Sequence, residues 1–181
     1  MTEKVKAKIF DENGLRRTIV RLVHEIIERN KGVENLCIVG IRTRGVYLAE
    51  RIINEIEKIE GSKLPLGILD ITMYRDDFRQ RLDQPQIQQT DIPFDIDDKK
   101  IILIDDVLYT GRTTRAAIEA IMSFGRPAMI QLAVLIDRGH RELPIKPDYV
   151  GKDISTAIGE EVKVKMKEVD NEDSVILIEL S

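Results

Sequence analysis

Apolar residues return along this chain with a helical period in some segments and form short unbroken runs in others. Over residues 11–30 and 45–59 they return every three or four positions, which predicts two amphipathic helices. Asp11 is placed to cap the first helix, Gly32 lies just beyond its end, and Gly61 stops the second. The positions expected in the core are Leu15, Ile19, Leu22, Val23 and Ile26 in the first helix, and Val46, Leu48, Ile52, Ile53 and Ile56 in the second.

The unbroken apolar runs predict strands that are buried on both faces. They cover residues 36–40, 100–107 and 129–136, and we expect a further strand over 65–74. A third helix is predicted over 113–124, ended by Gly125 and Pro127. Strands that alternate with helices indicate an α/β fold with a mainly parallel, doubly wound sheet. In such sheets ligands bind beyond the carboxyl ends of the strands.

Three segments depart from this alternation. Residues 75–93 are polar and rich in glutamine, which is typical of a functional lid, a disordered connection or a projecting hairpin. Residues 137–152 contain Gly139, Pro144 and Pro147 and are expected to be irregular. Residues 161–169 and 174–180 alternate enough to predict a C-terminal hairpin.

Composition narrows the class of protein. The chain has 181 residues, of which 43% are apolar, so we expect one domain over residues 1–181. Lys and Arg total 28 and Asp and Glu total 32; a net charge of −4 argues against a protein coated in nucleic acid but allows one basic face. A single Cys37 excludes an internal disulfide framework. Without a signal-type or membrane-length apolar run, we expect a soluble, cytoplasmic protein.

The strongest chemical signal is the segment 101–114, IILIDDVLYTGRTT. Asp105 and Asp106 stand at the end of a buried strand, and a turn rich in hydroxyls and glycine leads into a helix. Backbone N–H groups and the helix dipole make that turn, residues 110–114, a site for a phosphate group; we call it the phosphate turn. Ionised carboxylates suit two vicinal hydroxyls or a hydrated cation. The segment therefore predicts a sugar-phosphate site, and neither a Walker A pattern nor GxGxxG is present.

A second candidate anion site is the glycine-bounded sequence GIRTRG at residues 40–45. It lies between a strand and a helix and holds Arg42, Thr43 and Arg44 near the helix N-terminus. On their own, these arginines would be read as solvated surface charges. A glycine-bounded turn with two arginines and a hydroxyl at a helix N-terminus also suits an oligo-anion.

Together these motifs closely resemble those of type I phosphoribosyltransferases. The resemblance implies that Asp105 and Asp106 hold the ribose hydroxyls of phosphoribosyl pyrophosphate (PRPP), with Mg²⁺ carried by PRPP nearby. It implies that residues 40–45 form the pyrophosphate loop and that Arg75, from a flexible lid over about 75–93, reaches the pyrophosphate. The PRPP and nucleotide contacts implied are Thr43, Arg44, Asp105, Asp106, Val107, Leu108, Tyr109, Thr110, Gly111, Arg112, Thr113 and Thr114.

Residues 137–144, DRGHRELP, and 148–152, DYVGK, resemble one branch of that family, whose members transfer phosphoribosyl groups to uracil and also bind messenger RNA. The resemblance implies a uracil pocket under a hood, residues 137–152, formed by Asp137, Arg138 and Gly139. It implies uracil, UMP, UTP and a pyrimidine-operon leader mRNA as partners, regulation by attenuation, and a homodimer or larger homo-oligomer. Segment 155–159 lacks the basic residue that many relatives carry.

The last prediction is a basic face for RNA. Arg17, Arg21 and His24 form one helical stripe, which in a generic protein is a solvated face. The resemblance extends it to a continuous patch, which we call the RNA face: Arg17, Arg21, His24, Arg29, His140, Arg141, Lys146 and Lys152. Alanine at Arg21 or Arg141 is expected to weaken RNA binding and spare uracil transfer. A catalytic enzyme alone, for uracil or for hypoxanthine and guanine, and a regulator without turnover are the alternatives.

Overall fold

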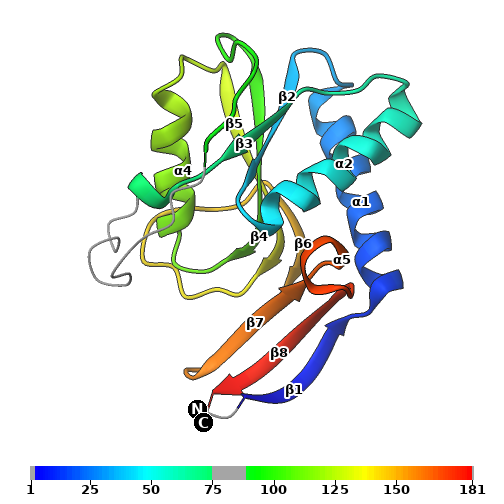
Figure 1. Ribbon diagram of the computed structural model, residues 1–181, viewed down its shortest axis with the longest axis vertical. Helices are drawn as coiled ribbons and strands as arrows, with labels where there is room; N and C mark the ends of the chain where they lie inside the picture. The colour runs from blue at the N-terminus through cyan, green and yellow to red at the C-terminus, as the bar shows by residue number, and fades with distance from the viewer. Residues whose placement is uncertain (1–2, 75–88, 181) are drawn as a thin grey trace.

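The central element is a five-stranded sheet with the strand order β3-β2-β4-β5-β6, in which all neighbours are parallel (Figure 1). The computed structural model describes residues 3–74 and 89–180. The strands of this sheet are β2 (Leu36–Ile41), β3 (Leu66–Leu69), β4 (Lys100–Leu108), β5 (Met129–Asp137) and β6 (Tyr149–Asp153). The parallel sheet expected from the sequence is confirmed.

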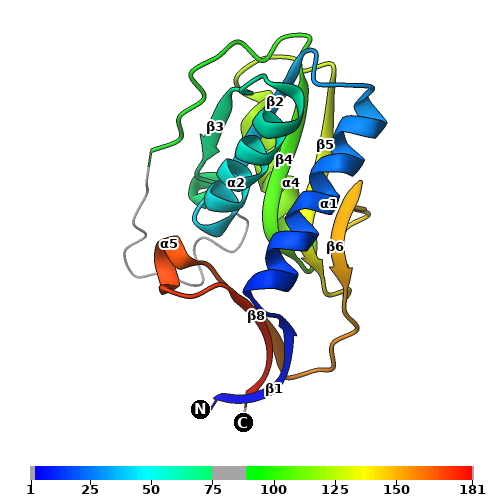
Figure 2. The same ribbon diagram turned by 90° about the vertical axis from the view of Figure 1, so that its right-hand side faces the viewer.

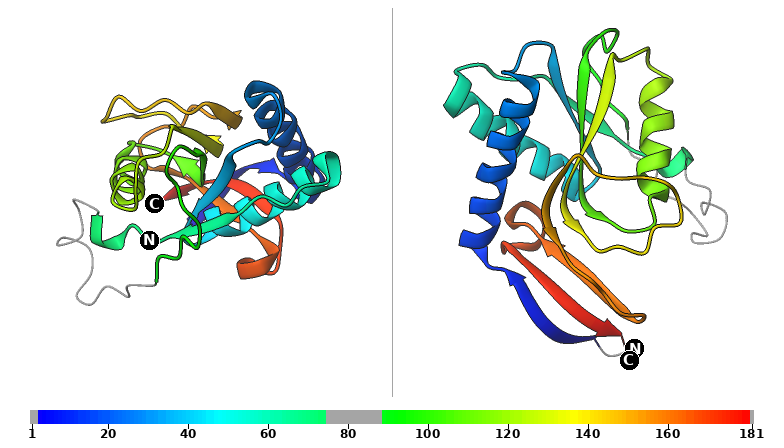
Figure 3. Two further views of the ribbon diagram at one scale, coloured as in Figure 1. Left: turned by 90° about the horizontal axis from the view of Figure 1, so that it is seen from above. Right: turned by 180° about the vertical axis from the view of Figure 1, so that it is seen from behind.

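Helices cover both faces of this sheet, so the doubly wound arrangement is also confirmed. The helices α1 (Glu12–Asn30) and α2 (Arg44–Glu60) lie on one face, as Figure 2 shows. Helix α4 (Arg112–Met122) lies on the opposite face (Figure 3). The predicted sugar-phosphate site, residues 105–114, lies at the carboxyl end of β4.

The core reflects the alternation of side chains along β4. Ile102 and Ile104 pack with α1 and α2, whereas Ile101 and Leu103 pack with the alanines of α4. All four side chains are buried, which is why this strand reads as an unbroken apolar run. Cys37 is buried on the α4 side, as core packing requires.

The ends of α1 follow the local signals in the sequence. The Asp11 carboxylate accepts the backbone N–H of Gly14 at 2.7 Å, which caps the first turn. At the other end Lys31 adopts a left-handed conformation and Gly32 follows with φ of 111°. The predicted start and stop of this helix are confirmed.

A second, antiparallel sheet lies beyond the carboxyl ends of the parallel strands (Figure 1). Its order is β1-β8-β7, formed by β1 (Glu3–Phe10), β8 (Ser174–Leu180) and β7 (Glu160–Lys165). The predicted C-terminal hairpin is confirmed as β7 and β8, with a short helix α5 (Lys167–Asp170) between them. Strand β1, for which the sequence analysis assigned no element, pairs with β8 from Glu3 to Phe10.

Two further segments differ from the sequence analysis. Residues 149–153 form the edge strand β6, although the hood was expected to be irregular throughout. The strand expected over 65–74 is limited to β3 and is followed by a 3₁₀ turn, Thr72–Tyr74. Most of the predicted lid, residues 75–88, lies outside the described residues, but Asp91 pairs with Ile68 through two backbone hydrogen bonds of 2.7 and 2.8 Å.

Candidate active site

The two aspartates predicted to hold ribose lie near the end of β4, as the strand predicted over 100–107 implies. Both carboxylates accept a backbone N–H from the following residue at 2.9 Å, Asp105 from Asp106 and Asp106 from Val107. Asp105 is buried with 7% exposure, whereas Asp106 is half-buried. Asp105 is therefore part of the packed interior, and Asp106 is the one that borders a pocket.

The phosphate turn follows directly and leads into α4. Gly111 has φ of 92°, which favours glycine, and it is the residue that precedes the helix. The Thr110 hydroxyl accepts the backbone N–H of Arg112 at 3.3 Å. Thr110 and Thr113 are half-buried, while Thr114 is 1% exposed and its hydroxyl has no hydrogen-bond partner among the described residues. A phosphate group at this turn would meet the helix N-terminus and the hydroxyls of Thr110 and Thr113.

The hood packs against the phosphate turn. The carbonyl oxygen of Thr110 accepts the backbone N–H groups of Glu142 and Leu143 at 2.9 and 3.1 Å. The Arg112 side chain pairs with Glu142 at 2.6 Å, and the carbonyl oxygen of Leu108 accepts the N–H of Arg138 at 3.0 Å. The structure therefore joins the predicted phosphate site and the predicted base site into one unit.

The predicted pyrophosphate loop, residues 40–45, packs tightly between β2 and α2. A Cβ atom on Gly45 would lie 2.7 Å from the Ile104 carbonyl oxygen, and one on Gly40 would lie 2.7 Å from that of Gly45. These close approaches explain both glycines. The Arg42 guanidinium donates to the Gln89 carbonyl oxygen at 3.0 and 3.3 Å. Thr43 precedes α2 without a side-chain cap, and Arg44 opens the helix.

Arg44 does not point into solvent but pairs with Asp170 at the end of α5. Its Nε and one Nη donate to the two carboxylate oxygens at 3.2 and 2.8 Å. Burial alone would raise the pKa of Asp170, but the hydrogen bonds from Arg44 and from the Met166 N–H hold this pKa below its usual value. The residue predicted to bind pyrophosphate therefore already holds a carboxylate.

A pocket of about 520 Å³ lies between the carboxyl ends of the parallel strands and the antiparallel sheet. Asp106, Val107 and Tyr109 border it on one side, together with Arg44 and Arg138. Strand β7 and Asp170 border it on the other. The wall that β7 and Asp170 provide is the part of the site that the sequence analysis missed; its signal was the alternating strand 160–165 followed by the acidic turn, residues 168–173.

The three predicted hood residues differ in their surroundings. Arg138 is 9% exposed, its guanidinium lies 4.0 Å from the centre of the Tyr109 ring, and it donates to the Glu160 carbonyl oxygen at 2.7 Å. Asp137 accepts the N–H of Gly139 at 3.0 Å and pairs with Arg141. Burial alone would raise the pKa of Asp137, but these two donors hold it below its usual value, so Asp137 is an ionised acceptor at neutral pH.

Arg141 was assigned to the RNA face, yet its guanidinium is part of the hood. It donates to the carbonyl oxygens of Tyr109 at 2.8 Å and Ile145 at 2.9 Å, in addition to Asp137. Its side chain is 23% exposed. These contacts argue against the expectation that alanine at Arg141 would spare uracil transfer, because the guanidinium links the predicted base site to the phosphate turn.

The other residues of the RNA face are exposed: Arg17, Arg21, His24, Arg29, His140, Lys146 and Lys152. Helix α1 runs beside β6, and Arg21 donates to the Val150 carbonyl oxygen at 3.3 Å, so α1 and the hood share one side of the molecule (Figure 2). Arg21 also pairs with Glu25 at 2.6 Å, and Arg29 pairs with Asp148 at 2.9 Å. His140 contacts the Thr156 carbonyl oxygen at 2.6 Å.

The described residues contain no cluster of three His, Cys, Asp or Glu side chains that could enclose a metal ion. This fits the way in which Mg²⁺ binds with a phosphorylated substrate, through one or two carboxylates, substrate oxygens and water. Asp106 borders the pocket and Asp105 is the buried residue before it in β4, so one or two carboxylates are present. Arg75, the predicted lid residue, lies outside the described residues. No helix of the described chain is long and apolar enough to cross a membrane.

The structure combines a doubly wound sheet, an aspartate pair near the end of β4 and a phosphate turn, as expected for a phosphoribosyltransferase. The family model described as a phosphoribosyl transferase domain matches residues 7–168, so the chain belongs to the phosphoribosyltransferase family. Within it, the chain is 63% identical to Bifunctional protein PyrR of Caldicellulosiruptor bescii, over 98% of this chain and 97% of the relative. It is 58% identical to the protein of the same name from Pelotomaculum thermopropionicum, over 96% of both chains. The chain thus belongs to the PyrR proteins of this family.

Solved structures agree on the fold. A hypoxanthine phosphoribosyltransferase of Staphylococcus aureus matches with a TM-score of 0.71 and 21% identity, covering 95% of this chain and 92% of that one. The hypoxanthine phosphoribosyltransferase of Trypanosoma cruzi matches with a TM-score of 0.74 and 15% identity, covering 98% of both. At these identities the likeness establishes the type I phosphoribosyltransferase fold and says nothing of the base that is used.

Proposed function

We propose that this protein transfers the phosphoribosyl group of PRPP to uracil, giving UMP and pyrophosphate, and that it binds pyrimidine-operon leader mRNA in response to uridine nucleotides. The observation that carries the enzymatic part is that Asp106, Arg44, Tyr109 and Arg138 border the same pocket. It joins a hydroxyl-binding carboxylate and an anion-binding arginine with a hood side chain. Membership among the PyrR proteins supports both parts.

The geometry lowers the barrier by positioning and by charge, without a covalent nucleophile. Asp106, with Asp105 behind it, accepts the ribose hydroxyls, and the phosphate turn holds the 5-phosphate. The ionised carboxylate of Asp137 is an acceptor suited to a base N–H, which uracil presents. Asp105 and Asp106 would hold the Mg²⁺ that PRPP carries, and the ion would supply positive charge to the pyrophosphate leaving group. Arg75 is proposed to reach that pyrophosphate from the lid.

The regulatory part rests on the exposed residues of the RNA face. A local group of arginines, lysines and histidines along α1 and the hood suits the phosphates of a hairpin, while its unpaired loop bases supply specificity. Two acidic residues on the same side of the molecule neutralise part of the RNA face: Glu25 pairs with Arg21, and Asp148 pairs with Arg29. RNA must therefore compete with these ion pairs. UMP or UTP in the pocket favours RNA binding through the hood that both sites share, and linkage then requires RNA to tighten nucleotide binding equally.

The same proposal includes the setting in which the protein works. Residues 1–181 act as one domain, and copies of it associate into a homodimer or a larger homo-oligomer. We propose a cytoplasmic location, which the proposed partners PRPP, uracil and mRNA support.

Asp106→Asn tests the enzymatic part. Loss of a charged acceptor for a ribose hydroxyl should lower kcat/KM for PRPP about 10- to 100-fold. Asp106 is preferred to Asp105 because Asp105 is buried, so its replacement also changes packing. Asp153→Asn is the control: Asp153 is an exposed carboxylate at the end of β6, and its replacement should leave UMP formation unchanged. Full activity of Asp106→Asn would refute the assignment.

The choice of base and the RNA function are tested on the wild-type chain. UMP formation from uracil is compared with nucleotide formation from hypoxanthine and guanine, each with PRPP and Mg²⁺. Binding of a pyrimidine-operon leader hairpin is then measured at low salt, with and without UMP, against a scrambled hairpin. Equal binding of the two hairpins would leave a catalytic enzyme only, which is the second candidate.

A further inference from the structure

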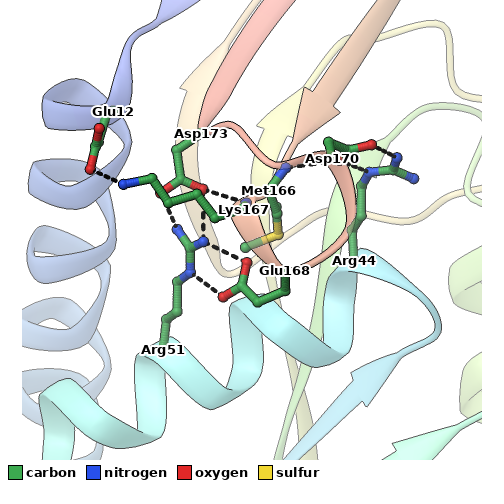
Figure 4. A network of polar contacts seen from close by, with 8 residues as sticks. All are labelled: Glu12, Arg44, Arg51, Met166, Lys167, Glu168, Asp170 and Asp173. Carbon is green, nitrogen blue, oxygen red and sulfur yellow. Dashed lines mark hydrogen bonds and ion pairs between the residues drawn. The ribbon is translucent and has the colours of Figure 1, made fainter.

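The acidic turn, residues 168–173, is joined to α2 by two arginines that differ in their surroundings. Figure 4 shows Arg51 between Glu168 and Asp173, and Arg44 facing Asp170. Arg51 donates to Glu168 at 2.6 and 2.9 Å and to Asp173 at 2.7 and 3.0 Å. Within residues 3–74 and 89–180, Arg44 holds one carboxylate, that of Asp170. The turn therefore has a strong anchor in Arg51 that does not depend on Arg44.

Only the Arg44–Asp170 pair borders the pocket. Both residues line it together with Asp106, whereas Arg51, Glu168 and Asp173 do not. The pair is also partly exposed, with 34% of the Arg44 side chain and 20% of the Asp170 side chain accessible. A ligand in the pocket can therefore reach this pair, while the pairs of Arg51 stay in place.

The proposed function brings the pyrophosphate group of PRPP to this pair. Pyrophosphate should bind Arg44 more strongly than a carboxylate does. A pyrophosphate group offers paired oxygens for the guanidinium, as a carboxylate does, but with more negative charge. At close range its negative charge would repel the Asp170 carboxylate, and this repulsion favours the release of Asp170 from Arg44.

We propose that Asp170 occupies Arg44 in the free protein in place of the pyrophosphate of PRPP and is exchanged for it when PRPP binds. Asp170 is thus a positioning residue that lowers the affinity for PRPP by competing for Arg44. The inference rests on the proposed phosphoribosyl transfer. Because Arg51 keeps the acidic turn against α2, the exchange is a movement of side chains and does not require the antiparallel sheet to separate from α2.

Asp170→Asn removes the competing charge and keeps the shape of the side chain. Its amide oxygen can still accept the Met166 N–H, which Asp170 accepts at 2.9 Å, so the turn is retained. A partly exposed ion pair of this kind corresponds to about a two- to fivefold effect on binding, so the Kd for PRPP should fall by that factor. The Kd for UMP, which has no pyrophosphate, should not change.

The matched control is Glu168→Gln in the same turn. It removes a carboxylate that pairs with Arg51 and not with Arg44. Arg51 retains its pair with Asp173. Its Kd for PRPP should equal that of the wild type. A second comparison uses the Arg44→Gln background, in which Asp170→Asn should no longer alter the Kd for PRPP, because Asp170 acts through Arg44.

The experiment is a calorimetric titration of each full-length variant with PRPP and Mg²⁺, and separately with UMP. Wild-type binding of PRPP and formation of UMP from uracil come first, since their absence would refute the proposed function itself. If both are present, unchanged or weaker PRPP binding by Asp170→Asn overturns the exchange. A gain that persists in the Arg44→Gln background also overturns it, since it would show general repulsion by the carboxylate.

Discussion

Replacing Arg141 by alanine removes a guanidinium that joins three parts of the site. It donates to Asp137 in the hood, to the Tyr109 carbonyl oxygen before the phosphate turn, and to the Ile145 carbonyl oxygen later in the hood. In Arg141→Ala these three acceptors lose a charged donor together. We therefore expect two measurable losses, one in stability and one in uracil transfer.

The size of the stability loss follows from the burial of the Arg141–Asp137 pair. Exposed pairs contribute about 0–1 kcal/mol, while breaking a fully buried pair costs about 3–5 kcal/mol. The side chains of Arg141 and Asp137 are 23% and 12% exposed, and two further acceptors lose a donor. We expect the free energy of unfolding to fall by about 2–3 kcal/mol.

The stability loss in Arg141→Ala should depend on pH, because it involves the ion pair of Asp137. The pKa of Asp137 is lowered in the folded protein, so its ion pair stabilises the fold above the ordinary carboxylate pKa of 3.8 and is lost as pH falls through the lower folded value. The deficit of Arg141→Ala should therefore be constant from neutral pH down to about pH 5. Below pH 3.8 it should shrink as Asp137 becomes protonated.

Urea unfolding of the two proteins at several pH values measures the stability term, and UMP formation measures transfer. A base carboxylate that is no longer held in place should lower kcat/KM for uracil about 10- to 100-fold. Arg126→Ala is the control, an exposed arginine before the other end of β5, with an expected change within about 0.5 kcal/mol and unchanged transfer. Wild-type stability and wild-type transfer in Arg141→Ala would refute this account of the hood.

Two further substitutions test the pyrophosphate loop and the RNA face. In Gly45→Ala the new Cβ would meet the Ile104 carbonyl oxygen at 2.7 Å; the overpacking cost of about 1–3 kcal/mol exceeds the helix gain of about 1 kcal/mol, so urea unfolding should show a net loss. Unchanged stability would contradict the close approach. In Arg17→Ala the slope of log K against log salt for the leader hairpin should flatten by about 0.7 while UMP formation stays unchanged. An unaltered slope would remove Arg17 from the RNA face.

The elements that the sequence predicted correctly are those in which the pattern of apolar residues within the segment shows which positions are buried. Strand β4 is buried on both faces, and α1 buries a stripe of leucine, isoleucine and valine, so each segment shows its period without reference to its partners. The caps of α1 are equally local, since Asp11 binds Gly14 three residues away. The segment 101–114 likewise predicts a phosphate turn, because a strand end, a glycine and a helix start are consecutive in the chain.

Strands β1 and β6 could not be predicted in this way. Residues 3–8 of β1 are exposed throughout, so no buried face marks the strand, and its pairing partner β8 lies at the other end of the chain, with Glu3 opposite Leu180. In β6, Tyr149 is the buried residue, and the edge of β5 makes the segment a strand by pairing Ala133 with Tyr149. These strands depend on a backbone partner, which is a property of the tertiary structure.

The roles of the arginines divide in the same manner. From the sequence alone it follows that Arg44 lies in a glycine-bounded loop at a helix start and that Arg141 lies in a basic hood segment. The contact of Arg44 with Asp170, 126 residues away, and those of Arg141 with Asp137, Tyr109 and Ile145 depend on how the chain folds. A guanidinium reaches several ångströms from its backbone, so its partner is set by which segments the fold brings within that reach.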